Sequence, residues 1–584
     1  MDIFINQISN VVKDAFENLG YTRESGKVNT SNRPDLCQYQ CNGALADAKK
    51  FKKAPVVIAN EVVEKLKENP MFAKLEIAGP GFINITINDE FLVDYVNKMN
   101  GDEKLGLSKA TEVKKVIVDY GGANVAKPLH IGHLRSAIIG ESIKRIAKFM
   151  GHDVIGDVHL GDWGLQMGMV ISEVERRNPE LPYFDASFEG EYPVEAPFTI
   201  DELEDIYPYA SKLAKTDEKV MEAAKQATVE LQQGRRGYYA LWKHILNVSV
   251  KDLKKNYGDL NVEFELWNGE SDAQKLIPAM IQELKDGGFA KESEGALVFD
   301  VSEETDKSPV PPLLLLKSDG ASLYGTTDLA TVVERVRDLK ADELIYLADK
   351  RQGLHYEQFF RGAKKSGIAG ENVTLDFVGF GTMNGKDGKP FKTREGGVMR
   401  LADLINLIKE AGKEKLKDNK NIAEEDVEEI SSKVGLAALK YGDLSNQASK
   451  DYIFDIERFA SFEGNTGPYI LYTIVRIKSI LNKAGVTEFS NIAAPQSDAE
   501  RNLMLQLIKF NEVIESSYRD RAPHKICEYV YELSNNFNKF YNDTKILAEE
   551  DEAKKSSWLS LINLVKNTLE QCLDLLGMES VERM

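Results

Sequence analysis

The sequence predicts an α/β fold built on a doubly wound parallel sheet, followed by an all-helical region. From Lys114 the chain reads as strand, loop, helix and strand, over residues 114–120, 133–150 and 153–158. The strand pattern returns at residues 343–349 and 374–380 with a helical segment between. Such alternation is typical of parallel sheets covered by helices on both faces. After Ala423 only helical periodicity remains.

The first 105 residues are predicted to form a separate α+β domain. They combine helical segments with one short strand candidate, FINITIN at 82–88. GDEKLG at 101–106 is rich in turn-forming residues and predicts a linker to the next domain. A chain of 584 residues is too long for one hydrophobic core, so several domains are expected.

Residues 106–440 are predicted as the central α/β domain and residues 441–584 as an all-α bundle. The alternation is interrupted from about residue 170 to 300, which indicates an insertion. The insertion begins acidic, with eleven Asp and Glu against two Arg between Ser172 and Ala210, and then becomes helical. Only three prolines follow residue 440, as expected for long helices.

The four cysteines give no sign of a metal centre. Cys37 and Cys41 lie close together, but no second pair or nearby histidine completes a zinc site. Free thiols in a reducing compartment are the better interpretation, and we expect no structural metal. No apolar run is long enough to span a bilayer and no secretory leader is recognisable. We therefore predict a cytoplasmic protein without a membrane partner.

The net charge of −19 does not exclude a nucleic-acid partner. Net charge is a sum over the whole chain, whereas contacts to phosphates are local. The stretch from Ser172 to Ala210 alone contributes −9 of this charge, so the acidity is concentrated. Composition therefore neither predicts RNA binding nor rules it out.

The most informative segment is DYGGANVAKPLHIGHLRSAIIG, residues 119–140. A strand ends at Asp119, a glycine-containing loop follows, and Pro128 lies where a helix can start. His130 and His133 are three residues apart and share one face of that helix, and Gly132 between them leaves room for a flat ring or a phosphate.

This order of elements indicates a nucleotide site. Free N–H groups at a helix N-terminus bind phosphates at the carboxyl ends of strands in such sheets. Neutral histidines can donate hydrogen bonds to phosphate oxygens as negative charge builds in a transition state. Two histidines that only cap or pack a helix are the alternative, and an isolated H-x-x-H is a weak motif. The strand, loop, proline and helix around it favour the nucleotide site.

HIGH at 130–133 matches the class I aminoacyl-tRNA synthetases, and GANVAKPLHIGHLRSAIIG resembles the arginyl-tRNA synthetases in particular. The resemblance continues through HLGDWGLQMG (159–168), SLYGTTDLA (322–330), YLADKRQGLHYEQFF (346–360), GKDGKPFKTREGG (385–397) and SFEGNTGPYILY (461–472). It covers essentially the whole chain and is closest to the bacterial form. It implies a Rossmann-like class I catalytic domain with an N-terminal tRNA-contacting domain and a C-terminal anticodon-binding bundle.

The resemblance implies an ATP site around the HIGH motif. His130, His133 and Lys127 would be catalytic, together with Lys392 and Arg394 of a later loop. ATP contacts would come from the segment after the first strand and from two further residues: Ala123, Asn124, Val125, Ala126, Lys127, Pro128, Leu129, His130, Ile131, Gly132, His133, His355 and Lys389.

A second class I motif is a lysine-bearing loop that closes on the triphosphate. Here it reads KPFKTREGG, with Thr393 where the second lysine usually stands. Lys389, Lys392 and Arg394 are all basic, and which residue meets the phosphates is left open. We expect Lys127, beside the HIGH motif, to supply the missing charge. A solvated turn rich in Lys and Gly is the alternative.

The arginine site implied by the family agrees with the residue chemistry. A guanidinium with five donors requires an acidic partner and aromatic support. Tyr324 and Asp328 are four residues apart, hence adjacent on a helix, and Gln352 is expected to assist them. Asp119 and Asn124, beside the nucleotide loop, suit the α-amine. A helix start with an acidic residue near its N-terminus is the alternative for the first pair.

RNA contacts are harder to assign. In the N-terminal domain, QYQCNG at 38–43 fits the family, and Gln40 is the candidate tRNA contact, with a buried polar residue at a helix start as the alternative. In the C-terminal bundle several tyrosines could stack bases, although most tyrosines at helical spacing belong to the core. They are Tyr469, Tyr472, Tyr529, Tyr531 and Tyr541.

The resemblance implies an arginine–tRNA ligase. Arginine and Mg-bound ATP would give arginyl-adenylate and pyrophosphate, and arginine would then pass to the terminal ribose of tRNA(Arg), releasing AMP. The family implies a monomer. Two other functions compete: a class I nucleotidyltransferase that joins small acids and amines, and a non-catalytic tRNA-binding relative. The long helical C-terminus speaks against the first, and the intact His130, His133, Asp328 and Gln352 speak against the second.

Overall fold

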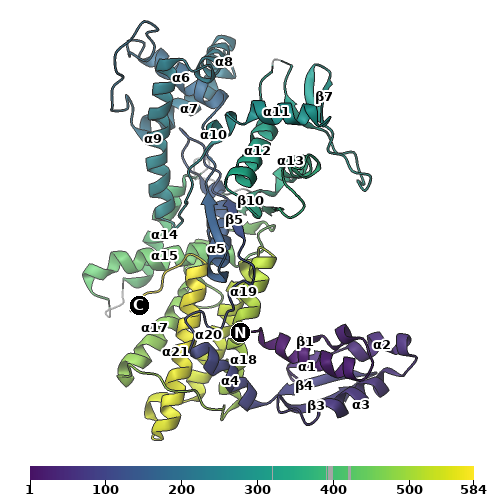
Figure 1. The fold of residues 1–584 in the computed structure, drawn as a ribbon. Helices are drawn as coiled ribbons and strands as arrows, with labels where there is room; N and C mark the ends of the chain where they lie inside the picture. The colour runs from purple at the N-terminus through teal and green to yellow at the C-terminus, as the bar shows by residue number, and fades with distance from the viewer. Residues whose placement is uncertain (319, 390, 392–398, 418–421) are drawn as a thin grey trace.

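The computed structural model describes residues 1–584 except 319, 390, 392–398 and 418–421 (Figure 1). At its centre lies a four-stranded sheet, all of whose paired strands are parallel. The strand order is β11 (Thr374–Phe380), β10 (Glu343–Asp349), β5 (Lys115–Asp119) and β6 (Asp153–Asp157). The predicted doubly wound α/β class is confirmed, and the four central strands lie within a residue or two of their predicted ranges.

The central strands β5 and β10 bury both of their faces. Val116 and Val118 of β5 face α5 (Ile131–Met150), whereas Ile117 between them belongs to a second core with the helices of the opposite side. Those helices are α12 (Tyr324–Val333) and α13 (Gly353–Lys365). Alternate side chains of a strand point to opposite faces, so helices on both sides are required to cover them.

The chain adds strands to the sheet on both sides of β5, and the change of side falls between β5 and β10. From β5 it runs through α5 to β6 on one side, and it later returns to β10 on the other side. At such a switch point the loops after the two central strands separate and leave a crevice at the carboxyl edge. α5 ends at Gly151, whose φ of 98° is favourable only without a side chain.

Two groups of elements fill the predicted insertion and the stretch after it. The first is helical and stands at one end of the molecule: α6 (Leu165–Arg177), α7 (Ile200–Ala214), α8 (Glu218–Gln232) and α9 (Arg236–Gly258) (Figure 1). The second surrounds an antiparallel sheet: α10 (Glu270–Gln274), α11 (Ile277–Asp286), β7 (Ala290–Ser293), β8 (Ala296–Phe299) and β9 (Leu313–Leu316).

The C-terminal part of the chain is helical, as predicted. α14 (Leu401–Leu416) and most of α15 (Val427–Leu444) lie before residue 441, within the range predicted for the central domain. The bundle that follows contains α17 (Gly467–Ala484), α18 (Asp498–Leu507), α19 (Phe510–Arg519), α20 (His524–Asp543) and α21 (Glu552–Leu575). A short α16 (Ile456–Phe459) and a two-residue pairing of β12 (Met383–Asn384) with β13 (Tyr452–Ile453) connect it to the central domain. Arg135 of α5 also donates to Asp443 of α15 at 3.0 Å, within the buried interface.

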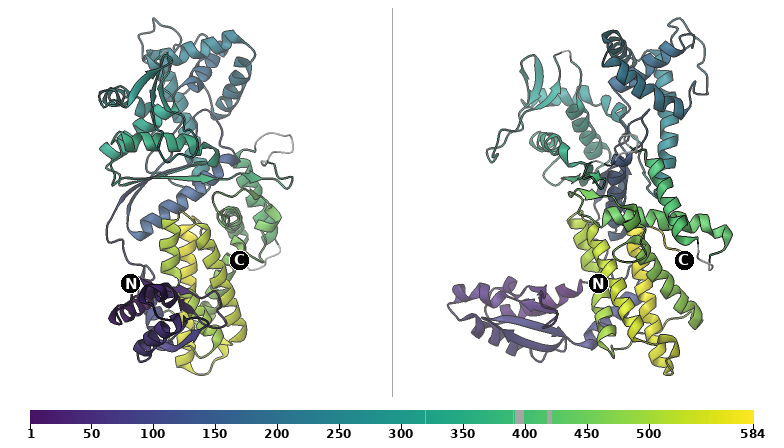
Figure 2. Two further views of the ribbon diagram at one scale, coloured as in Figure 1. Left: turned by 90° about the vertical axis from the view of Figure 1, so that its right-hand side faces the viewer. Right: turned by 180° about the vertical axis from the view of Figure 1, so that it is seen from behind.

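The N-terminal domain projects sideways from the bundle (Figures 1 and 2). It contains an antiparallel sheet in the order β1 (Val28–Thr30), β2 (Tyr39–Cys41), β4 (Phe82–Ile87) and β3 (Phe72–Ala78), with α1 (Phe4–Asn18), α2 (Gly43–Phe51) and α3 (Pro55–Leu66). The sequence predicts only β4. The strands β1 and β2 have three residues each, too few for a period of two to be recognised.

α4 (Asp89–Asn100) connects this domain to the rest of the chain and packs on the bundle. Arg501 of α18 donates to Asp89 at 2.5 Å, and Asn97 donates to the carbonyl of Ile492 at 2.8 Å. No helix in the described part of the chain is long and apolar enough to cross a membrane.

Candidate functional site

A cavity of about 570 Å³ opens at the switch point, beyond the carboxyl ends of β5 and β10. It brings together ten residues that the sequence predicts as site residues, from three separate segments: Asp119, Ala123, Asn124, His130, Gly132, His133, Tyr324, Asp328, Gln352 and His355. It also contains two that the sequence does not mark as ligand contacts, His159 and Glu270. Convergence of polar groups in one concave site is the usual mark of a binding pocket.

The two histidines of the HIGH motif cap α5. Nδ1 of His130 accepts the N–H of Gly132 at 3.0 Å, and Nδ1 of His133 accepts the N–H of His130 at 3.1 Å. Their rings lie 4.0 Å apart. Because Nδ1 acts as acceptor in both, the proton of each neutral ring is on Nε2. Each histidine therefore keeps one N–H free to donate.

Burial holds both histidines in the neutral form. It lowers the pKa of His133 to about 3, and the neighbouring His130 and Lys127 act in the same direction. The pKa of His130 is also lowered, by burial and by Lys127. Neutral N–H donors that are already oriented by backbone bonds suit oxygens on which charge develops.

Gly132 differs from its expected role. A Cβ at this position would lie 2.7 Å from Cε1 of His130, so the imidazole itself occupies the space that was expected for a ligand. The absence of a side chain instead lets His130 fold back over the start of the helix. α5 begins at Ile131, later than Pro128, which lies in the preceding loop.

The first part of the loop between β5 and α5 lines the cavity, with Ala123 and Asn124. Four other predicted ATP contacts are buried and do not line it: Val125, Ala126, Leu129 and Ile131. Ala126 has a φ of 56° and donates its N–H to Ser249 of α9 at 2.9 Å. The loop also pairs with the segment after β6, since the N–H of Gly161 bonds the carbonyl of Ala123 at 2.9 Å and Val125 bonds that of Gly161 at 3.1 Å.

One wall of the cavity is the first turn of α12. Tyr324 begins the helix and Asp328 lies one turn later, so the predicted adjacency of these two residues is present. Asp328 accepts a 2.5 Å hydrogen bond from His355 of α13. His355 was expected to contact ATP, but its imidazole bonds this carboxylate in the wall. Gln352 caps α13 at the same edge.

Glu270, at the start of α10, completes this wall. Burial raises the pKa of its carboxyl to about 8, and the charges of Asp328 and Asp162 act in the same direction, against that of His159. Asp162 of the DWG sequence fixes the neighbouring turn, because it accepts from the N–H and the hydroxyl of Ser271 at 3.0 and 2.6 Å. The cavity thus holds an acid that carries a proton at neutral pH until a cation arrives.

Arg335 forms the buried floor of the site. It lies in a π-helical turn, Glu334–Asp338, that continues α12, and it is 1% exposed. Its Nη2 donates to Asp119 at 2.6 Å and to Asp157 at 2.7 Å. Burial raises the pKa of Asp119 while Arg335 opposes that shift. Arg335 therefore positions the carboxylate at the end of β5.

His159 belongs to the same floor. Burial alone would lower its pKa, but Asp157, 3.8 Å from Nδ1, raises it to about 9. The ligand atoms of Asp119, Asp157 and His159 lie within 4.8 Å of one another, a spacing that could hold a metal ion. However, the guanidinium of Arg335 already bonds both carboxylates. These residues therefore fit an ion-pair network better than a metal site.

The two described basic residues that the sequence predicts, Lys127 and Lys389, do not line the central cavity. Lys127 does not line the central cavity but a neighbouring chamber that shares His130 with it. Lys389 is exposed in a turn where its carbonyl accepts the N–H of Gly385 at 2.8 Å. Lys392 and Arg394 fall outside the described residues.

Gln40 lies in β2 and donates to Asn84 across the sheet at 2.8 Å, so the alternative of a helix start is wrong. Among the five tyrosines, Tyr529 is buried and bonds the carbonyl of Leu507. Tyr472 and Tyr541 are exposed on the bundle, and the guanidinium of Arg476 lies 4.9 and 5.5 Å from their ring centres. This trio has the composition of a base-stacking surface.

Glu270 and Arg335 escape sequence reasoning for identifiable causes. Glu270 follows no motif and lies in the stretch assigned to the insertion. ERVRD at 334–338 has the pattern of a solvated, charged helix end, and only the packing of α12 against the sheet shows that its first arginine is buried. The one sequence pattern near Glu270 in space is DWG at 162–164. The carboxylate of Asp162 accepts the N–H of Ser271, the residue after Glu270.

The fold and the site together define a class I aminoacyl-tRNA synthetase, and three comparisons agree. Residues 96–456 match the model of the tRNA synthetases class I (R) catalytic domain, residues 470–584 the DALR anticodon binding domain, and residues 3–87 the arginyl tRNA synthetase N-terminal domain. The chain belongs to the arginyl-tRNA synthetase family.

The similarity to individual relatives covers the full length of the chain. The arginine–tRNA ligase of Alkaliphilus oremlandii is 64% identical and that of Agathobacter rectalis 59% identical, each with 100% of both chains covered. The crystal structure of arginyl-tRNA synthetase from Plasmodium falciparum superposes with a TM-score of 0.84 at 26% identity and covers 100% of both chains.

Proposed function

We propose that this chain joins L-arginine to tRNA and that the central cavity holds the arginine. The observation that carries this assignment is the presence of two carboxylates, Asp328 and Glu270, with Tyr324 in one cavity. Asp119 and Asn124 line the same cavity. A guanidinium needs acidic acceptors and tolerates an aromatic face. The α-amine then falls to Asp119 and Asn124, next to the histidine pair.

ATP is proposed to occupy the part of the cavity beside the HIGH motif. The Nε2–H donors of His130 and His133 would contact its phosphate oxygens, and backbone groups of residues 123–129 would cradle the nucleotide. Lys127, Lys389, Lys392 and Arg394 are the proposed sources of positive charge near the triphosphate. The Mg²⁺ that accompanies ATP would supply further charge neutralisation.

The reaction has two transfers. A carboxylate oxygen of arginine bonds to the α-phosphorus of ATP, and the bond from that phosphorus to the bridging oxygen breaks, so that pyrophosphate leaves with the electron pair. A terminal ribose hydroxyl of tRNA then bonds to the arginyl carbonyl carbon, and AMP leaves as the hydroxyl proton is released. Here the protein positions the reactants and stabilises charge, with the oriented histidines serving the first transfer.

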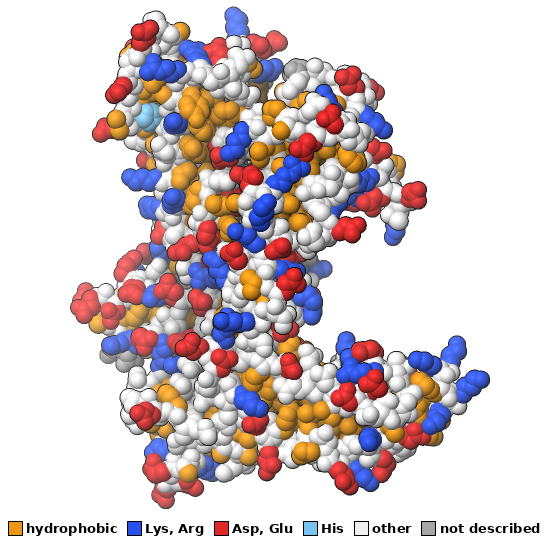
Figure 3. Space-filling model, in the orientation of Figure 1, with side chains coloured by type: hydrophobic (Ala, Val, Ile, Leu, Met, Phe, Trp, Pro, Cys, Tyr) orange, Lys and Arg blue, Asp and Glu red, His pale blue; other side chains and the backbone are white. Residues whose placement is uncertain are grey.

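The other two domains are proposed to hold the tRNA. The space-filling view shows the molecule hollowed between the projecting N-terminal domain and the catalytic domain (Figure 3). The exposed Tyr472, Arg476 and Tyr541 on the bundle are the proposed anticodon-side contacts, and Gln40 is the proposed contact in the N-terminal domain. We propose that the enzyme acts as a cytoplasmic monomer.

The test is ATP–pyrophosphate exchange and tRNA esterification measured across amino acids, with and without tRNA. Arginine should support both reactions. Citrulline, which has nearly the same shape but no charge, should be rejected by about 10⁴ or more, because its neutral side chain cannot form an ion pair with the two carboxylates of the cavity. Exchange without any esterification would support a small-molecule nucleotidyltransferase, and tRNA binding without exchange would support a non-catalytic relative.

A further inference from the structure

His355 lies in the first turn of α13 and lines the central cavity. Its Nε2 and Oδ2 of Asp328, on α12, are 2.5 Å apart, and both side chains are 30% exposed. Asp328 acts on its surroundings as a negative charge. An ionised carboxylate only accepts hydrogen bonds, so the imidazole N–H is the donor. The two helices are therefore joined at the cavity wall by one directed hydrogen bond.

Aromatic packing also holds the imidazole of His355. Its ring centre lies 5.6 Å from that of Tyr356 and 5.4 Å from that of Phe359, which is fully buried. The rings of Tyr356 and Phe359 in turn lie 5.2 Å apart. A side chain whose orientation is fixed by its neighbours keeps the direction of its hydrogen bond when no ligand is bound. His355 is thus a rigid support for Asp328.

The two acids of the cavity wall differ in their partners. Asp328 accepts from His355, whereas no hydrogen bond or ion pair reaches the carboxyl group of Glu270 from any residue that the structure describes. Burial raises the pKa of Glu270 to about 8, and the charge of Asp328 acts in the same direction. Neighbouring carboxyl groups compete for one proton, and a donor on one of them decides which keeps the charge. His355 therefore favours the charge on Asp328 and the proton on Glu270.

The same hydrogen bond limits how Asp328 can bind a guanidinium. Oδ2 is engaged by His355, and Oδ1 has no partner among the residues that the structure describes. A guanidinium often binds a single carboxylate through both of its oxygens. On Asp328 that arrangement would compete with His355 for Oδ2. One oxygen from Asp328 and one from Glu270, which lines the same cavity, gives the guanidinium two acceptors without this competition.

We propose that His355 is a positioning residue for the selection of arginine: it occupies Oδ2 of Asp328, keeps that acid charged and leaves Oδ1 to the guanidinium, while Glu270 supplies the second acceptor. This inference rests on the proposed function, because it places arginine in the central cavity. Without the donor, Asp328 would take up a proton more readily, and a protonated acid can donate to the ureido oxygen of citrulline. Rejection of citrulline therefore depends on His355.

The decisive variant is His355→Phe in the full-length protein, because phenylalanine keeps a flat ring among the aromatic neighbours but cannot donate. His355→Gln is the conservative variant, since its amide can still donate to Asp328. Gln358→Leu is the matched control: it lies on the same helix and loses a hydrogen bond of 2.8 Å to the carbonyl of Pro311, away from the cavity. KM and kcat are measured for arginine, citrulline and ATP with tRNA present.

His355→Phe should raise the KM for arginine by about 10- to 100-fold and lower the preference for arginine over citrulline by about tenfold or more. The KM for ATP and kcat should change by less than about twofold. His355→Gln should restore most of both properties, and Gln358→Leu should behave as wild type. In an Asp328→Asn background, His355→Phe should have little further effect, because the charge that it supports is already absent.

Four results would overturn the proposal. An equal rise in the KM values for arginine and ATP would make His355 a support of the whole cavity. A rise for ATP alone would restore the ATP contact predicted from the sequence. Effects that His355→Gln does not rescue, or that add fully to those of Asp328→Asn, would separate His355 from Asp328. Unchanged kinetics would leave it no role in selection. Wild-type protein that failed to activate arginine would contradict the proposed function, which is a separate result.

Discussion

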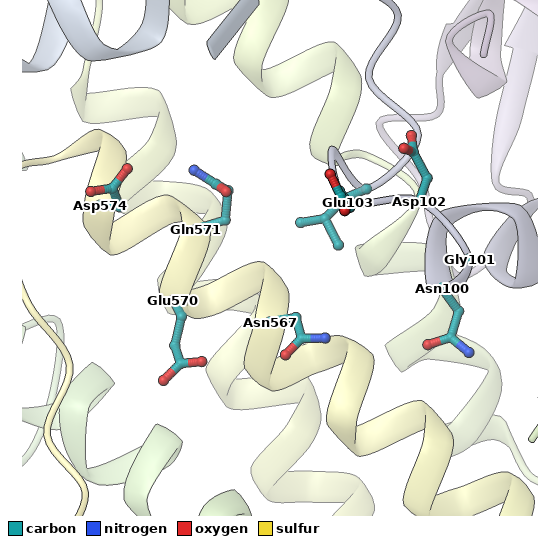
Figure 4. Close-up of a pocket in the computed structure, with 9 residues that line it drawn as sticks. Asn100, Gly101, Asp102, Glu103, Asn567, Glu570, Gln571 and Asp574 are labelled. Carbon is teal, nitrogen blue, oxygen red and sulfur yellow. The ribbon is translucent and has the colours of Figure 1, made fainter. Parts of the chain in front are cut away.

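Two cavities of nearly equal size occur in this molecule, and their linings differ. The central cavity has a volume of about 570 Å³, and a pocket between α21 and the linker that follows α4 has about 530 Å³ (Figure 4). The second pocket is also rich in carboxylates. Three of its four acids, however, already have partners: Asp102 accepts the N–H of Gly106 at 2.8 Å, Glu570 pairs with Lys478 at 2.8 Å, and Asp574 pairs with Arg145 at 2.9 Å.

The comparison shows that volume and charge do not identify a site. In the central cavity, burial raises the pKa of Glu270 and lowers that of His133, and Arg335 holds Asp119 in place. These groups are kept in unfavourable protonation states or at a desolvation cost, which a bound substrate can offset. In the second pocket the acids join structural elements. The following predictions test this distinction, from the largest expected effect to the smallest.

Replacing Arg335, which forms the floor of the site, should have the largest effect on stability. Arg335→Met leaves Asp119 and Asp157 buried without their cation, and breaking a buried pair in this way costs about 3–5 kcal/mol. Urea unfolding should show that destabilisation, with a raised KM for arginine in whatever folded protein remains. Arg337→Met is the control, because its pair with Glu283 is exposed and should contribute at most about 1 kcal/mol. Equal destabilisation in the two variants would contradict the distinction between floor and surface.

Removing the acidic wall should affect one substrate only. Asp328→Ala takes away the partially buried carboxylate that is proposed to bind the guanidinium, which should cost about 2–4 kcal/mol, or roughly 30- to 1000-fold in the KM for arginine. The KM for ATP should hardly change. Steady-state kinetics with Asp338→Ala, an exposed acid at the end of the π-helical segment, gives the baseline. A parallel rise in both KM values would show that Asp328 supports the whole site and does not select arginine.

The raised pKa of Glu270, about 8, predicts a pH effect of intermediate size. Under the proposed assignment arginine binds the ionised acid, so below pH 8 its binding must displace a proton. Apparent affinity should therefore rise with pH by up to about tenfold per unit and level off above pH 8. Arginine binding across this range, compared with Glu270→Gln, measures the effect. A curve that is unchanged in the variant would assign the titration to another group.

The free energy of unfolding of the ligand-free protein should change with pH in the opposite direction, falling as pH rises. The pKa of Glu270 in the folded state is above its ordinary value of 4.5. The contribution of this acid to the free energy of unfolding is therefore fully present below about pH 4.5. It is lost as pH rises towards about 8, because the unfolded chain ionises this acid first. Glu270→Gln should remove this dependence, whereas Glu283→Gln, an exposed acid with a lowered pKa, should not.

The second pocket should give the smallest effect. Glu103→Gln and Asn567→Ala alter side chains of its lining for which the described structure shows no hydrogen bond, so kcat/KM for arginine, ATP and tRNA should change by less than about twofold. A decrease of more than tenfold in folded protein would give this pocket a role in the reaction. The comparison between the two cavities would then fail.

Much of the fold and part of the site could be predicted from the sequence. β10 and β11 have the predicted ranges because long apolar runs beside helical segments identify buried parallel strands. His130, Tyr324 and Asp328 could be found because a motif or helical spacing marks them. Glu270 and Arg335 could not, since their roles arise from burial, which depends on segments far away in the sequence. The role of Gly132 as a seat for His130 likewise depends on a rotamer that no pattern shows.

α12 has a consequence for attempts to change the amino acid that this enzyme selects. The helix carries Asp328 at one end, and its π-helical continuation carries Arg335 at the other. A shift or rotation of the helix that enlarges the pocket would also displace the guanidinium from Asp119. The position of Asp328 and the position of Asp119 are therefore both set by this one helical element. Engineering for an arginine analogue should exchange side chains on α12 and leave the position of its backbone unchanged.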